Sequence, residues 1–169
     1  MLVSLPNILT LGLLLPAVWG GYSVENFAGC CGLTWALVGV GLDVLTPWDL
    51  RYGEEFDVLS NGWLLVRLVQ MGLVAYVHLA VPCQSLTLAR HPALRDQVFP
   101  RGRPGLKEAQ QLLVSTGNEL VDFACYLCLT LWKANAYFRL EPLGVLGFGR
   151  SLVFKSWQNF VVLDALISP

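Results

Sequence analysis

The sequence has few charged residues, and none of its basic residues lies near the N-terminus. Charged side chains make up 14% of the 169 residues and hydrophobic ones 55%, with a mean hydropathy of +0.57. The first lysine or arginine is Arg51, so the apolar residues 1–20 lack the positive segment that opens a typical secretory signal. Pro6 and Pro16 interrupt the run, which argues against a regular membrane-spanning helix. We therefore expect residues 1–20 to form a buried or frayed apolar segment.

The cysteines form no regular framework. There are five, an odd number, and Cys125 and Cys128 have no second pair and no histidine nearby. This pattern argues against a secreted disulfide scaffold and against a zinc site, so we expect a reducing intracellular compartment and no metal. The net charge of −1 excludes a global attraction to nucleic acid. Five of the eleven Lys and Arg residues nevertheless fall between Arg90 and Lys107, where they could contact a phosphate backbone.

Apolar runs that alternate with helical patterns predict an α/β domain over residues 21–169. Strands are expected at 21–27, 43–48, 73–80, 137–140 and 160–166, helices at 33–40, 62–71 and 106–132, and a long loop at 81–105. Such an order is typical of a Rossmann-like, mostly parallel sheet with helices on both faces. No repeat, low-complexity tract or linker divides this single domain.

Four of the expected strands are followed by residues that can carry chemistry. A small-residue turn begins at Phe27, and Asp49, Cys83 and Glu141 follow the next three strands. Parallel strands deliver their carboxyl ends to one edge of a sheet, where open α/β folds bind ligands. An acid such as Asp49 suits the hydroxyls of a ribose there. Cys83, preceded by a proline, is a candidate nucleophile.

In this order, the turn Phe27-Ala28-Gly29-x-x-Gly32, Asp49, Pro82-Cys83-Gln84-Ser85 and Glu141 resemble the motifs of the cytosine-5 DNA methyltransferases. The resemblance spans about residues 22–142, and Pro-Cys-Gln is its most specific part. It implies a class I methyltransferase fold, S-adenosyl-L-methionine as methyl donor, and DNA with a flipped cytosine as partner. The thiolate of Cys83 would add to C6 of the base, and Glu141 would contact N3 and the amino group. A nuclear location would follow if the source is eukaryotic.

The resemblance also implies which residues bind the cofactor and the DNA. The cofactor-binding residues would be Phe27, Ala28, Gly29, Gly32, Asp49, Pro82 and, as a further candidate, Asp57. The nucleic-acid-binding residues would be Gln84, Ser85, Arg90, Arg95, Arg101 and Arg103.

Three features depart from the family's pattern. Cys31 stands where the first motif has a glycine, Pro142 stands where an asparagine follows the glutamate, and the stretch after Glu141 offers no room for the family's later arginine motif or for a target-recognition domain. We therefore keep two alternatives to an active methyltransferase. The first is a catalytically inactive remnant or binding module with the same fold. The second is a membrane-associated or secreted protein, because residues 1–20 are apolar.

Overall fold

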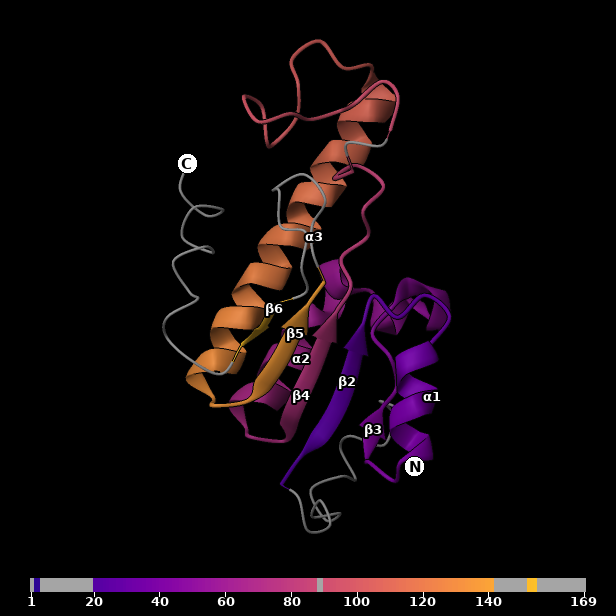
Figure 1. The fold of residues 1–169 in the computed structure, drawn as a ribbon, viewed down its shortest axis with the longest axis vertical. Helices are drawn as coiled ribbons and strands as arrows, with labels where there is room; N and C mark the ends of the chain where they lie inside the picture. Colours follow the sequence, from indigo (N-terminus) through magenta and orange to yellow (C-terminus); the bar gives the residue numbers. More distant parts are fainter. Residues whose placement is uncertain (1, 4–19, 88–89, 142–151, 155–169) are drawn as a thin grey trace.

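A single, mainly parallel sheet organises the chain. The computed structural model describes residues 2–3, 20–87, 90–141 and 152–154. Six strands run in the order β1-β3-β2-β4-β5-β6 (Figure 1). The strands are β1 (Leu2–Val3), β2 (Tyr22–Asn26), β3 (Val44–Leu45), β4 (Val74–Leu79), β5 (Tyr137–Leu140) and β6 (Leu152–Phe154). All neighbours are parallel except β5 and β6, which are antiparallel.

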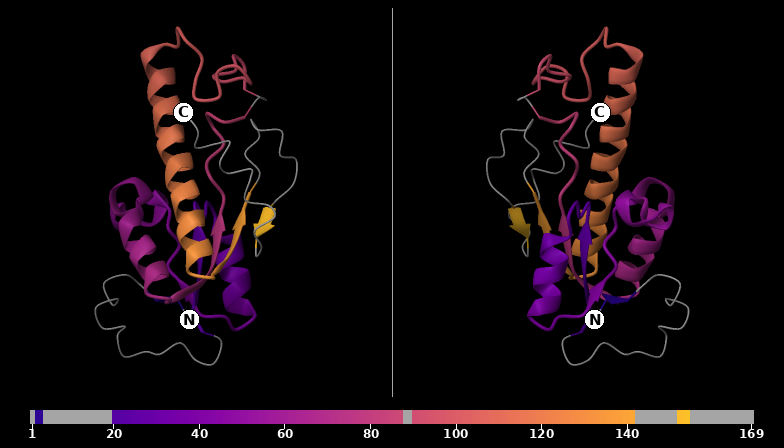
Figure 2. Two further views of the ribbon diagram at one scale, coloured as in Figure 1. Left: turned by 90° about the vertical axis from the view of Figure 1, so that its left-hand side faces the viewer. Right: turned by 90° about the vertical axis from the view of Figure 1, so that its right-hand side faces the viewer.

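Helices cover both faces of this sheet, so the predicted α/β, Rossmann-like class is confirmed. Helix α1 (Gly32–Gly39) lies against one face, whereas α2 (Val58–Gln70) and α3 (Glu108–Lys133) lie against the other (Figure 2). Two short 3₁₀ turns, η3 (Leu50–Tyr52) and η4 (Glu54–Phe56), connect β3 to α2. The strand order reverses between β2 and β4, because the chain leaves β2 for β3 on one side and returns to β4 on the other. Such a switch point is where open α/β sheets bind ligands.

The main hydrophobic core lies between the sheet and the pair α2 and α3. Val24, Val77 and Phe138 point from three adjacent strands toward this side and are at most 1% exposed. Leu65 of α2 and Leu127 of α3 are fully buried in the same cluster. Burial of a leucine side chain stabilises a fold by about 1.5–3 kcal/mol, so this face supplies most of the driving force for folding.

Helix α3 is long and apolar enough to cross a membrane by length and composition. Its residues Ala124, Leu127 and Leu131 are at most 1% exposed and pack in the core. The first half of α3 extends beyond the carboxyl edge of the sheet and carries the loop of residues 90–107 (Figure 1).

Most of the predicted elements agree with the structure. The strand expected at 43–48 is shorter, because β3 covers only Val44–Leu45. Helix α2 begins at Val58 rather than at residue 62, because Asp57 caps it by accepting a hydrogen bond from the Leu59 amide. Strands β1 and β6 had no counterpart in the predictions. The strand expected at 160–166, most of the segment 1–20 and residues 142–151 lie outside the described residues.

Candidate functional site

The carboxyl ends of four parallel strands lie side by side. The Phe27 amide donates to the Trp48 carbonyl, at 2.8 Å, beyond the ends of β2 and β3. The Ala80 amide donates to the Asn26 carbonyl at 3.2 Å, and the Glu141 amide donates to the Leu79 carbonyl at 2.9 Å. The segments that follow β2, β3, β4 and β5 therefore leave the sheet at one level. This is the edge on which the sequence placed the glycine turn, Asp49, Cys83 and Glu141.

A pocket of about 310 Å³ opens at this edge. That volume is at the lower end of the range for small-molecule sites. Four of the predicted cofactor-binding residues line it: Phe27, Asp49, Asp57 and Pro82. The rest of the lining is mostly apolar and comes from Trp48, Leu50, Phe56, Val58, Leu59, Thr116 and Leu120. The wall therefore combines two carboxylates with the rings of Trp48 and Phe56, which meet edge to face with centroids 6.1 Å apart.

The two carboxylates of the pocket also hold its backbone in place. Asp49 accepts hydrogen bonds from the Gly29 amide at 3.0 Å and from the Arg51 amide at 2.9 Å. Asp57 accepts from the Leu59 amide at 3.2 Å and from the Ser60 hydroxyl at 2.6 Å. A carboxylate has about four acceptor positions, so each can still accept a hydrogen bond from a ligand hydroxyl or amine.

The turn after β2 has an unusual backbone. Phe27, Gly29 and Cys31 have φ angles of 61°, 53° and 58°, in the left-handed region. This conformation is unfavourable for residues with a Cβ and is common at binding sites. Ala28 is buried within the turn and Gly32 begins α1. Gly29 has open space where a Cβ would be, so its backbone is open to close approach.

Glu25 is a buried residue of this site that the sequence analysis did not identify. It is 6% exposed, and its Oε2 accepts hydrogen bonds from the Thr34 amide at 2.7 Å and hydroxyl at 2.6 Å. A carboxylate at the N-terminus of a helix is favoured by the helix dipole. Glu25 therefore occupies part of the N-terminus of α1, which can offer fewer free amides to a ligand than its sequence predicts. An acid within the apolar strand 21–27 was the available signal.

Cys31 and Tyr52 lie together against the glycine turn. The Tyr52 hydroxyl donates to the Gly29 carbonyl at 2.7 Å. Hydrogen bonding with Cys31, followed by burial, raises the pKa of Tyr52 to about 12. Burial raises the pKa of the Cys31 thiol, so this thiol stays protonated at neutral pH. A neutral thiol therefore lies in the turn between β2 and α1.

Cys83 and Glu141 are both accessible at the carboxyl edge. The Cys83 side chain is exposed, and its carbonyl accepts from the Leu86 and Thr87 amides at 2.9 Å, which closes a turn after Pro82. The Glu141 side chain is 51% exposed, and its Oε1 lies 3.2 Å from Nε2 of His78. Neither residue lines the pocket, but Cys83 follows the pocket residue Pro82, and Glu141 follows the neighbouring strand. Because β4 and β5 are adjacent and parallel, both residues follow strand ends at the same edge of the sheet.

Arg95 lies in the interior, where it binds the predicted DNA-binding loop to α3. It is 3% exposed and donates to the Ser85 carbonyl, the Ser85 hydroxyl and the carbonyls of Pro100 and Val114, at 2.8–3.1 Å, and also to the Asn118 side chain. Ser85 is 4% exposed. Gly117 is required at the contact, because a Cβ there would meet the Ser85 hydroxyl. The expected DNA contacts through Arg95 and Ser85 therefore do not fit this conformation.

The other predicted DNA-binding residues are exposed or partly exposed. Arg101 forms a two-point ion pair with Asp122 at 2.7 and 3.0 Å, and Arg103 pairs with Asp96 at 2.9 Å. Arg90 approaches the Gln84 carbonyl at 3.5 Å. The side chains of the Arg101 pair are 57% and 53% exposed, and exposed pairs contribute about 0–1 kcal/mol. Arg101 and Arg103 can therefore change partners at little cost.

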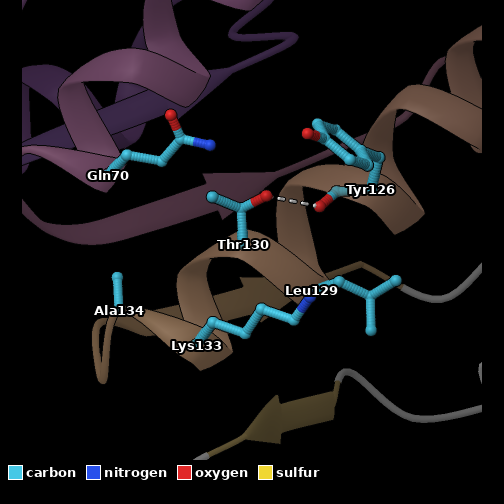
Figure 3. Close-up of a pocket in the computed structure, with 6 residues that line it drawn as sticks. All are labelled: Gln70, Tyr126, Leu129, Thr130, Lys133 and Ala134. Carbon is cyan, nitrogen blue, oxygen red and sulfur yellow. Dashed lines mark hydrogen bonds between the residues drawn. The ribbon is translucent and has the colours of Figure 1, made fainter.

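A second pocket, of about 300 Å³, lies between the C-terminal ends of α2 and α3 (Figure 3). Gln70 ends α2, Tyr126, Leu129, Thr130 and Lys133 come from the last turns of α3, and Ala134 follows α3 directly. The Thr130 hydroxyl donates to the Tyr126 carbonyl at 3.0 Å. None of the predicted site residues reaches this pocket. Within the described part of the chain, no group of three or more His, Cys, Asp or Glu residues is placed to hold a metal ion.

Comparisons with known proteins identify no relative. The chain matches no protein-family model, and neither the curated proteins nor the solved structures include a significant match.

Proposed function

We propose that this chain is a methyltransferase-like domain that transfers a methyl group from S-adenosyl-L-methionine to C5 of cytosine in DNA. The observation that carries the proposal is the pocket at the carboxyl edge. Phe27, Asp49, Asp57 and Pro82 were selected from the sequence as cofactor-binding residues, and all four line one cavity. The residues are up to 55 positions apart, so their meeting in one cavity is not a result of proximity in the chain.

The chemistry of the pocket suits an adenosine group. The rings and apolar side chains of Trp48, Phe56 and Leu59 can contact the faces of a flat base, while Asp49 and Asp57 can accept hydrogen bonds from ribose hydroxyls and an exocyclic amine. When bound, the cofactor supplies an electrophilic methyl group. The residues of this chain bind it, orient it and exclude water from it.

The protein groups that act on the base would be Cys83 and Glu141. In this proposal the Cys83 thiolate would add to C6 of the cytosine, forming a C–S bond and increasing the electron density at C5. The cofactor would supply the methyl group to C5 as its S–CH₃ bond breaks and would leave as S-adenosyl-L-homocysteine. A water molecule would then take the C5 proton while the C–S bond breaks and the Cys83 thiolate is released. Glu141, whose side chain is 51% exposed, would contact N3 and the amino group of the base. Because a base inside a duplex is out of reach of both residues, the cytosine must be flipped out, at a cost of a few kcal/mol.

A binding experiment tests the cofactor site first. Calorimetry with S-adenosyl-L-methionine should give one site, and Leu59→Trp should weaken binding because Leu59 lines the cavity and is 41% exposed. Met71→Trp is the matched control, since Met71 also lies at the surface of the α2 region, is 65% exposed and is outside the cavity. Equal affinity in both variants would exclude this cavity as the cofactor site.

Methyl transfer is then measured with labelled cofactor and DNA. We expect Cys83→Ala to reduce incorporation to background, because no other group replaces the nucleophile. Cys30→Ala is the matched control, because Cys30 is also an exposed thiol beyond a strand end. Equal incorporation by wild type and Cys83→Ala would remove Cys83 from the mechanism.

An inactive binding module is the second candidate function. Two observations favour it: the thiol of Cys31 is buried in the glycine turn, and Arg101 and Arg103 already form ion pairs with carboxylates of this chain. Cofactor binding without transfer to any DNA would support this reading. Absence of cofactor binding would contradict the methyltransferase proposal.

A further inference from the structure

His78 is a buried ionisable residue in the middle strand of the described sheet. It is 5% exposed, its Nε2 lies 3.2 Å from Oε1 of Glu141, and its Nδ1 has no hydrogen-bond partner among the described residues. Burial of a polar group without a partner costs about 1–3 kcal/mol. An apolar residue would be more favourable in a central strand, so hydrophobic packing alone does not explain the imidazole at this position.

The strand register places His78 in a row of polar residues on the sheet face that α1 covers in part. Glu25 of β2 and Arg139 of β5 are its direct neighbours across the sheet, and Tyr76 precedes it on the same face. Oε2 of Glu25 is bound to Thr34 of α1. Among the described residues, the titratable or charged groups that the register places on this face include Glu25, Tyr76, Tyr137 and Arg139. His78 contacts Glu141, which follows β5, through Nε2.

The contact has a direct consequence for Glu141. Its side chain leaves the end of β5, is 51% exposed and would otherwise be free to choose among several rotamers. A rigid ring on the neighbouring strand holds Oε1, which leaves Oε2 as the oxygen available to a substrate. When Glu141 is ionised, the hydrogen bond requires the proton of the imidazole on Nε2, and Nδ1 is then the unpartnered acceptor.

We propose that His78 is the positioning residue for Glu141, fixing this carboxylate to receive the N3 and amino edge of a cytosine. The inference rests on the proposed function for the identity of the base, but the pairing of the two side chains does not depend on activity. In this proposal, the Glu141 carboxylate is oriented by His78, a buried side chain of β4.

Nuclear magnetic resonance tests the pairing without any substrate. The chain has two histidines, His78 and His91, so His91→Gln assigns both sets of ¹⁵N imidazole signals. We expect Glu141→Gln to move the His78 signals and leave the His91 signals in place. If the His78 signals do not respond, the two side chains do not interact in solution and the proposal is overturned.

Kinetics tests the consequence. His78→Leu keeps the volume but removes the donor, and should lower kcat about 10- to 100-fold, as for other partners that orient a functional side chain. His78→Gln retains an amide donor and should recover much of the rate. Neither variant should change the affinity for S-adenosyl-L-methionine, because His78 does not line the cavity.

The outcomes separate this inference from the function on which it rests. Loss of activity in His78→Leu through unfolding would lower the fraction of sites that bind cofactor in calorimetry, whereas loss of positioning lowers kcat alone. A wild-type rate in His78→Leu would overturn the proposal. If the wild type transfers no methyl group, the proposed function fails, and the response of the His78 signals to Glu141→Gln alone decides whether His78 orients Glu141.

Discussion

At the scale of single residues, the site is built from side chains whose burial differs sharply from what their type predicts. Arginine is usually found at the protein surface, and the position of Arg95 in a basic segment favoured contact with phosphate. Its burial depends on acceptors from Ser85, Pro100, Val114 and Asn118, which are distributed over two segments of the chain. Sequence spacing cannot show that such acceptors converge. The resemblance to the methyltransferase motifs indicated Phe27, Asp49, Asp57 and Pro82, and these four residues line one cavity because parallel strand ends meet at one edge of a sheet.

The five thiols should differ in reactivity. Cys30 and Cys83 are exposed, whereas Cys31, Cys125 and Cys128 are buried. Burial raises the pKa of each of the three buried thiols, so they hold less thiolate at pH 8, and thiolate is the reactive form. We expect Ellman's reagent at pH 8 to titrate two thiols quickly and the other three only after unfolding.

Cys30→Ala and Cys83→Ala should each remove one fast thiol. A third fast thiol that persists in both variants would mean that the glycine turn opens and exposes Cys31, contrary to the geometry described above.

At the scale of elements, β2, β4, β5 and α3 begin and end close to where hydrophobic periodicity predicts. The start of α2 was missed because Gly62 looked like a boundary, whereas the helix runs through it. The physical reason is tertiary: the ring of Phe123 of α3 occupies the space of a Cβ at Gly62. A glycine chosen for close helix packing cannot be told from a helix breaker without the partner helix.

This contact predicts opposite effects for two glycine substitutions. Gly62→Ala should destabilise the fold by about 1–3 kcal/mol, since the added methyl displaces Phe123 from the contact. Gly39→Ala, at the end of α1, has open space around the new Cβ and should be neutral or stabilise by up to about 1 kcal/mol. Urea denaturation measures both. Equal stability of the two variants would contradict the packing of α2 on α3.

At the scale of the whole molecule, the alternation of strands and helices predicted a parallel sheet, and the sheet was found. The order of the strands and the antiparallel pairing of β6 could not be predicted from the sequence. β6 has three residues and β1 has two, so neither provides enough alternation to form a pattern. Their pairing is decided by the neighbouring strand edges, which exist only once the rest of the sheet has formed.

The buried thiols of α3 predict how global stability depends on pH. Burial raises the pKa of Cys125 from 9.0 to about 11, and burial also raises that of Cys128. Between pH 9 and 11 the unfolded chain loses this proton and the folded chain keeps it, so stability falls as pH rises. The loss from Cys125 should reach about 2–3 kcal/mol at pH 11.

Urea titrations at pH 8, 9 and 10 should show this decline. The decline should be smaller in Cys125→Ala than in the wild type, even if the variant is less stable at pH 8. An identical pH dependence would mean that Cys125 is accessible to solvent.

Three of the four arginines in the loop between β4 and α3 make two kinds of contact: Arg95 is buried, whereas Arg101 and Arg103 form exposed ion pairs. Arg95 joins the loop to the body of α3 through a buried set of hydrogen bonds, and releasing it would leave several acceptors unpaired. Arg101 pairs with Asp122 of α3, and Arg103 pairs with Asp96 of the same loop. Exposed ion pairs contribute little to stability, so both arginines can exchange these carboxylates for a phosphate with little change in free energy. A polyanion could therefore bind Arg101 and Arg103 one at a time. Arg95 would meanwhile keep the loop, together with the turn at Cys83, attached to α3.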